Sequence, residues 1–266
     1  MNILVDKRTE LMSIILALSQ GNEYIEEHFP LGLEDEYRRD VVNHFSKYKD
    51  HKCIEIAKFI AKKQVGFSFD NPIRLAFSLD LNLQFNGQIE NFLLNELEDG
   101  KLLKDFMSEI VKFAQDSRFV DFYDRHKEYY LTKIKEVESL FDCKKFVCEL
   151  QKFLKKEILD NFEINIIPML INSNHGFNIN NTNIANIGLL SEDFKTIEPF
   201  NNGYNHIIIH EFCHNFVNCY TEDRELIMPE DFIQNLNEMG YRNPISYLND
   251  TIVRAMTIRL RKKLII

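Results

Sequence analysis

The sequence lacks two features that would place it in a specialised class, which are a paired set of cysteines and a long apolar run. Its five cysteines form an odd set without the short C-x-x-C spacing of disulfide frameworks or structural zinc knuckles. We therefore expect reduced thiols. No stretch reaches the roughly 18 consecutive apolar residues of a membrane span, so we expect no membrane partner.

The start of the chain lacks the basic residues that open a secretory signal peptide. Asp6 and Glu10 stand there instead, ahead of and within the first apolar segment. On this basis we expect a cytoplasmic protein, or a secreted one if a signal peptide was removed ahead of residue 1.

Positive charge is also in deficit, with 32 Lys and Arg against 41 Asp and Glu and a net charge of -9. Binding to phosphate backbones needs a basic patch that releases counterions, so we expect no nucleic-acid partner. One basic cluster does occur, near the end of an expected C-terminal helix, where cations complement the helix dipole. Its members are Arg254, Arg259, Arg261, Lys262 and Lys263.

The remaining composition is that of a globular protein, with 45% apolar and 27% charged residues. A length of 266 residues suffices for one large domain or two small ones. Residues 6–150 carry repeated helical periodicity, as in Leu11, Ile14 and Leu18. We predict a helical N-terminal region over residues 1–157.

The pattern changes near residue 162, where β-branched residues become dense. Strands are expected over about 162–171, 176–179 and 184–190, with an Asn-rich turn between the last two, and helices over about 204–219 and 244–263. We predict an α+β, predominantly helical fold, in which residues 158–266 form a metal-binding region with a small sheet. No linker composition marks the boundary, so the two regions can equally form one integrated domain.

An HExxH sequence runs from His210 through Glu211 to His214. Residues four apart lie one turn above each other on one helix face, so both imidazoles can reach one metal ion. Glu211 is offset by about 100 degrees, too far round to be the usual ligand. It is well placed to take a proton from a metal-bound water, whose pKa zinc lowers from 15.7 towards about 7. We expect Glu211 to act as a general base.

The residues around this motif favour a metal over chance occurrence. Ile207–Ile209, Phe212 and Phe216 make the expected helix largely apolar and therefore buried. Two histidines and a glutamate on a buried helix are costly without a metal or a hydrogen-bond network. We expect Zn²⁺ as the cofactor.

A catalytic zinc site has three protein ligands and one open position, so a third ligand is needed. The metzincin extension is absent, because Val217 and Tyr220 stand where it requires Gly and His. Asp250 is our candidate, since it shares a face of the last helix with Tyr247 and Arg254. The alternatives are Glu222, Glu225, Glu238 and His206.

Two further sets of residues have candidate roles near the metal. Cys213 lies within the motif but projects away from the histidine pair, so we interpret it as a core residue. A hydrolase also needs a donor that stabilises an oxyanion. Tyr247 is our candidate through its shared face with Asp250, and the alternatives are Tyr204, Tyr241 and His175.

The chain resembles an uncharacterised bacterial family of zincin-like metallopeptidases, catalogued as a domain of unknown function. The residues that carry the resemblance are Asp6–Leu11, His210–Asn218, Asn249-Asp250 and Arg254-Ala255. The resemblance implies zinc at His210 and His214, Glu211 as catalytic acid and base, and a third ligand on the later helix. Asp250 departs from the glutamate that a gluzincin would use there, so the later helix has to approach more closely.

These observations predict a zinc-dependent hydrolase, namely a metallopeptidase acting on a peptide or protein. An edge strand, provisionally 184–190, could hold an extended substrate by strand addition. Two other hypotheses stay open. One is a catalytically inactive zincin-like interaction module with a structural zinc, and the other is hydrolysis of a non-peptide amide.

Overall fold

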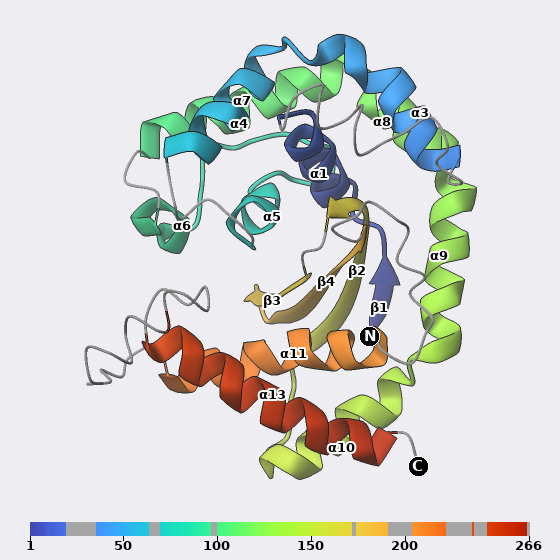
Figure 1. Ribbon diagram of the computed structural model, residues 1–266, viewed down its shortest axis with the longest axis vertical. Coiled ribbons are helices and arrows are strands. Elements are labelled where there is room, and N and C mark those ends of the chain that lie inside the picture. The colour runs from blue at the N-terminus through green and yellow to red at the C-terminus, as the bar shows by residue number, and fades with distance from the viewer. Residues whose placement is uncertain are drawn as a thin grey trace.

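The computed structural model shows an α+β protein that is predominantly helical, with one small sheet (Figure 1). This is the fold class that the sequence predicts. The structure describes residues 1–19, 36–63, 70–96, 100–171, 174–190, 204–221, 236 and 244–264. Within these ranges no helix is both long and apolar enough to cross a membrane.

Four strands form the sheet, in the order β1-β2-β4-β3. The strand β1 (Asn2–Leu4) pairs in parallel with β2 (Asn161–Ile171), and β2 pairs in parallel with β4 (Thr182–Leu190). The strand β3 (Asn174–Ile179) pairs antiparallel with β4. The first residues of the chain thus belong to the same sheet as residues 161–190.

A two-residue turn joins β3 to β4. Asn180 and Asn181 occupy it with φ of 50° and 60°, a conformation that asparagine tolerates better than most residues and that suits tight hairpins. The Asn-rich turn expected from the sequence is therefore confirmed. The expectation that 184–190 is an edge strand is wrong, because β4 has neighbours on both sides, and among the described residues β3 lies at the edge.

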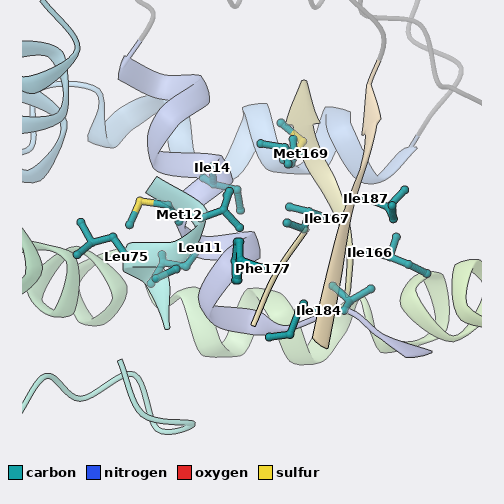
Figure 2. Close-up of a cluster of buried hydrophobic side chains, with 14 of the residues drawn as sticks. Leu11, Met12, Ile14, Leu75, Ile166, Ile167, Met169, Phe177, Ile184 and Ile187 are labelled. Atoms are coloured by element: carbon teal, nitrogen blue, oxygen red, sulfur yellow. The ribbon is translucent and has the colours of Figure 1, made fainter. Parts of the chain in front are cut away.

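The two faces of the sheet pack against different helices, because side chains alternate along each strand. Ile167, Ile184 and Phe177 point toward the helix α1 (Lys7–Ser19), whereas Ile166 and Ile187 point the other way (Figure 2). The second face is covered by the helix α11 (Tyr204–Thr221), which the helix α13 (Pro244–Leu264) in turn covers (Figure 1). The sheet is thus sandwiched between α1 and the pair of C-terminal helices.

The remaining helices follow α1 and β1 in an arc around the sheet (Figure 1). They confirm the helical periodicity of residues 6–150, and their apolar faces join one hydrophobic core with the sheet. Their bounds are α3 (Glu36–Phe45), the short 3-10 helix η1 (Ser46–Tyr48), α4 (Lys52–Lys63), α5 (Asp70–Ala76), α6 (Asn91–Glu96), α7 (Gly100–Asp116), α8 (Phe119–Arg125), α9 (Lys127–Leu140) and α10 (Cys143–Leu154).

A row of buried polar groups crosses the sheet on the α1 side. The Asn165 side chain accepts from the backbone N–H of Asp6 at 3.0 Å and donates to Thr9 and to Asn186 at 2.9 and 2.8 Å. Asn186 in turn donates to the carbonyl oxygen of His175 on β3 at 3.1 Å. Because buried amides are costly when unpaired, this row fixes the register between the start of α1 and the edge strand.

Glu10 is the most deeply buried carboxyl in this part of the fold, with a fully covered side chain. Tyr37 donates to it at 2.6 Å and Ser13 at 3.3 Å, and the backbone N–H of Met169 on β2 approaches at 3.4 Å. Burial raises the pKa of Glu10 to about 7, against the partly offsetting effect of these hydrogen bonds. Glu10 therefore links α1, α3 and the sheet through its hydrogen bonds. Its carboxyl group holds a proton more tightly than it does in the unfolded chain.

This carboxyl makes stability depend on pH in a defined direction. The folded-state pKa lies above the ordinary value of 4.5, so the contribution of Glu10 is present below about pH 4.5 and lost as the pH rises through about 7. We expect wild type to lose about 3 kcal/mol of unfolding free energy relative to Glu10→Gln between these limits. Urea unfolding of both proteins from pH 4.5 to pH 8 measures this loss of unfolding free energy.

The matched control is Glu138→Gln, which neutralises an exposed glutamate on α9. Its difference from wild type should stay nearly constant with pH. A difference between wild type and Glu10→Gln that also stays constant would contradict the burial of Glu10 as a protonated group.

Candidate metal centre

The helices α11 and α13 pack antiparallel, and this pairing builds the candidate site. His206 near the start of α11 lies close to Arg261 and Arg254 in the later turns of α13. His210, one turn on, faces Asp250, which lies earlier on α13. The residue order therefore runs in opposite directions along the two helices, so polar side chains of the middle turns meet.

The buried face of α11 explains why its histidines point at α13. Ile209, Phe212 and Cys213 are fully buried. The Phe212 ring packs against Phe146 and Phe162 with ring centroids 5.3 and 5.4 Å apart. His210 and His214 are only partly buried and lie on the adjoining face. The apolar pattern of the sequence thus orients the helix, and the i, i+4 spacing brings both imidazoles to the α13 side.

Three ligand atoms converge at this position. The Nε2 atoms of His210 and His214 are 3.1 Å apart, and the His210 Nε2 is 3.5 Å from Oδ1 of Asp250. One ligand atom from each residue lies within 4.8 Å of the others. Tetrahedral zinc with bonds of about 2.0–2.1 Å separates neighbouring ligand atoms by about 3.3 Å. The donor types fit a zinc ion, and the distances of 3.1 and 3.5 Å from the His210 Nε2 lie near this spacing.

The protonation of His210 also suits a ligand. Burial lowers the pKa of His210 to about 4, with His214 beside it contributing in the same direction and Asp250 opposing it. His210 is therefore neutral at physiological pH. A neutral imidazole offers the lone pair that metal coordination requires.

Asp250 is held by a neighbour on its own helix. Its side chain is 16% exposed, and its Oδ2 atom lies 2.9 Å from the guanidinium of Arg254, one turn later. The other carboxylate oxygen, Oδ1, is the one that faces His210. Arg254 therefore occupies one oxygen of the carboxylate and aims the second at the histidines, which is how outer-shell groups orient metal ligands.

Glu211 lies on the sheet side of the two histidines and is 6% exposed. Its backbone lies against β3 so closely that a Cβ atom added to Gly176 would come within 1.7 Å of the Glu211 carbonyl oxygen. Only glycine fits at this contact, so the edge strand and the motif helix are held in direct contact. A cavity of about 270 Å³ opens beside them, and its lining includes Glu211 and His214.

The other residues singled out in the sequence are distributed as follows. Cys213 is buried, and this burial raises the pKa of its thiol to about 12, as a core residue requires. His206 lies a turn before His210, with ring centroids 6.3 Å apart, and is not part of the ligand cluster. The alternatives Glu222, Glu225 and Glu238 lie outside the described residues, as does Tyr241.

The structure gives positions for three of the candidates for oxyanion stabilisation and does not favour one of them. Tyr247 lies on α13 three residues before Asp250, with a partly buried side chain, and its role stays a prediction. His175 is buried on β3 and contributes to the lining of the cavity. Tyr204 is the first residue of α11, and its side chain lies outside what the structure describes.

The residues that complete the cavity were not predicted from the sequence as site residues. Gly176 makes the close contact with α11, and Asn218, Ser246 and Asn249 line the cavity together with Asn174. Helical spacing could have indicated Asn218, seven residues after Glu211 on the same face. The sequence carries no comparable signal for Gly176, because that contact depends on how a strand and a helix pack.

The fold is α+β, and it brings ligand atoms of His210, His214 and Asp250 close enough together that they could hold a metal ion. A family model described as "Domain of unknown function (DUF4932)" matches residues 1–265, so the chain belongs to this family. The curated proteins and the solved structures contain no match to this chain.

Removal of a ligand side chain should abolish metal binding. We expect near-stoichiometric zinc in dialysed wild-type protein, and a loss of most of it in His214→Ala and in Asp250→Ala, because two ligands cannot replace three. Elemental analysis of the folded proteins measures this. Asp124→Ala, at an exposed position on α8, is the control that should keep its zinc. Full zinc in Asp250→Ala would exclude Asp250 as the third ligand.

The contact between Arg254 and Asp250 gives a separate expectation. We expect Arg254→Gln to weaken zinc affinity by about tenfold, because the carboxylate loses the group that orients it. Competition with a chromophoric chelator measures the affinity. The control is Arg259→Gln, which removes an exposed arginine from the same helix. Equal effects of the two changes would indicate a general charge effect instead of a positioning role.

Proposed function

We propose that this protein is a zinc-dependent hydrolase of the zincin kind, most specifically a metallopeptidase. The observation that carries the proposal is the convergence of His210, His214 and Asp250 beside the buried Glu211 at an open cavity. A zinc ion held there supplies Lewis-acid polarisation of a carbonyl group and acidification of a water molecule. With three protein ligands, one coordination position would stay open for a water molecule or the substrate.

The side chains around the cluster have distinct roles in this proposal. Glu211 takes the proton from the attacking water and later gives it to the leaving amine, which is general base followed by general acid catalysis. Its location next to His214 in the cavity lining supports this role. Arg254 keeps Asp250 oriented, and His210, which is neutral, completes the ligand set together with His214.

The edge strand supports a peptide as substrate. β3 ends the sheet as far as the structure describes it, so its outer backbone groups are candidates for pairing with an extended chain. The Gly176 contact brings this strand against the backbone of Glu211. A peptide added alongside β3 would therefore run past the cluster, a role that the sequence analysis assigned to 184–190.

The second candidate function is an inactive interaction module with a structural zinc. Such a site has a closed shell of four protein ligands. Among the described residues, the cluster contains three candidate ligands, and a cavity adjoins it. Cys213, the thiol nearest in sequence, is buried in the core. These observations favour the enzyme. Hydrolysis of a non-peptide amide uses the same residues and is separated by substrate profiling.

The proposal requires Glu211 for turnover but not for metal binding. We expect Glu211→Gln to keep its zinc and to lose hydrolysis by about 10²–10⁴-fold, because the amide occupies the same space without accepting the proton. Peptide-library digestion read by mass spectrometry identifies a substrate, and rates on that substrate give the comparison. Glu163→Gln, a partly buried glutamate on β2, is the control. Full activity in zinc-loaded Glu211→Gln would refute the mechanism.

A further inference from the structure

The edge strand β3 presents its two faces to different parts of the fold. Gly176 lies against the backbone of Glu211, on the side of the motif helix α11. The next residue, Phe177, points to the opposite face, toward α1 (Figure 2). Successive side chains alternate between the two faces of a sheet, and a chain paired alongside β3 continues this alternation. A peptide at this edge would therefore direct alternate side chains toward α11 and toward the α1 face.

On the α1 face, the helix α5 lies beside β3 (Figure 1). The ring of Phe77, which follows this helix, meets the Phe177 ring edge-on with a centroid distance of 5.8 Å. Arg74, within α5, places its guanidinium carbon 5.4 Å from the centroid of the same Phe177 ring. A cationic side chain thus lies next to the edge strand, one residue along from the contact between Gly176 and Glu211.

Three neighbours hold the Arg74 guanidinium in place. Its carbon lies 4.9 Å from the ring centroid of Phe92 as well as 5.4 Å from that of Phe177. Its Nε donates to Oε2 of Glu90 at 2.7 Å. Stacking on aromatic faces and a charge-assisted hydrogen bond restrict a side chain that otherwise samples many rotamers. Arg74 is therefore pre-organised, and it loses less conformational entropy when it binds a further group.

The remaining donors of Arg74 are available to a ligand. A guanidinium carries five N–H donors, and the bond to Glu90 uses the one on Nε. The other four are on the two terminal nitrogens. The Arg74 side chain is 22% exposed, and Phe92 beside it is 46% exposed. A group that approaches along β3 can therefore reach this end of the guanidinium.

Arg8 is the second cation on this face, and its bonds differ from those of Arg74. Its guanidinium carbon lies 4.5 Å from the ring centroid of Phe77. Both Nε and one terminal nitrogen donate to the carboxylate of Asp6, and the other terminal nitrogen donates to the carbonyl oxygen of Leu79 at 3.3 Å. Every nitrogen of Arg8 thus has an acceptor within the protein. Arg74 is the arginine of this face with donors to spare.

The terminal edge of a guanidinium suits a carboxylate, which accepts two parallel N–H bonds in one plane. A peptide carries such groups as aspartate and glutamate side chains. A neutral amide side chain at the same place would form hydrogen bonds without the charge, and a basic one would be repelled by Arg74. The position therefore discriminates between side chains by their charge.

We propose that Arg74 is a specificity-determining residue, which binds an aspartate or glutamate side chain of a peptide aligned along β3, on the sheet face opposite the metal cluster. The inference rests on the proposed function, because it requires a peptide substrate at the β3 edge. It adds the substrate class, namely peptides with an acidic residue at a fixed position near the cleaved bond.

Digestion of a peptide library by the zinc-loaded protein, read by mass spectrometry, tests this preference. We expect aspartate and glutamate to be enriched at one position near the cleaved bond. Matched peptides with glutamate, glutamine or lysine at that position then give values of kcat/KM. The glutamate peptide should exceed the glutamine peptide by at least about tenfold. This advantage should shrink as the salt concentration rises from about 50 mM to about 500 mM, because salt screens a partly exposed ion pair.

Variants of the ion pair separate recognition from structural support. Arg74→Gln should abolish the advantage of glutamate over glutamine, and Arg74→Lys, the substitute if Arg74→Gln does not fold, should reduce it, because an ammonium group lacks the planar fork. Glu90→Gln should increase the advantage, because it removes the carboxylate that shares the guanidinium. Equal losses in the Arg74 and Glu90 variants would indicate a purely structural ion pair. Arg125→Gln, at an exposed position on α8, is the control that should keep the preference.

The two proposals fail in different ways. Cleavage without acidic enrichment, or an advantage of glutamate that persists in Arg74→Gln, would overturn the role of Arg74 and leave the peptidase proposal intact. No zinc-dependent cleavage of any peptide in the library would contradict the proposed peptidase function, and the role of Arg74 would fall with it.

Discussion

The antiparallel packing of α11 against α13 is the constraint on which the rest of the site depends. One face of α11 is apolar and packs on the sheet and on Phe146 of α10, so its histidines lie on the face that meets α13. That helix places Asp250 opposite them, with an oxygen 3.5 Å from His210. Partly buried imidazoles need a hydrogen-bond partner or a shared ligand, and the Asp250 carboxylate lies close enough to His210 to take part in either.

The sheet supplies the second boundary of the site. β3 contacts α11 so closely at Gly176 that no side chain fits between them. The position of β3 is fixed in turn by the buried amide row from Asp6 through Asn165 and Asn186. Residues at the start of the chain therefore help to position the strand next to Glu211. The start of α1 is thus linked through the sheet to the strand that lies beside the site.

Much of this arrangement could be predicted from residue patterns. The helix and strand segments after residue 160 followed from apolar periodicity and β-branched density, and the i, i+4 spacing placed His210 with His214. Asp250 could be selected because it shares a helix face with Arg254, and the structure places it within reach of the histidines. The helix and strand predictions are confirmed because each depends on local geometry within one helix or strand, whereas the role of Asp250 as a ligand stays a prediction.

The remaining features depend on contacts between elements that are distant in the sequence. Strand order cannot be derived from the pattern of a single strand, so the edge was assigned to 184–190 instead of β3. The contact of Gly176 with Glu211 and the cavity lined by Asn218, Ser246 and Asn249 arise only when three elements meet. Residue type alone gives no signal for such contacts, because glycine and asparagine are common in turns as well.

The central claim is that His210, His214 and Asp250 bind one metal ion together. A crystal structure of the zinc-loaded protein with anomalous data at the zinc edge tests it most directly. The account predicts a single strong anomalous peak within about 2.0–2.2 Å of the Nε2 atoms of both histidines and of Oδ1 of Asp250, with Glu211 unligated. A peak coordinated by other residues, or a fourth protein ligand closing the site, would contradict it.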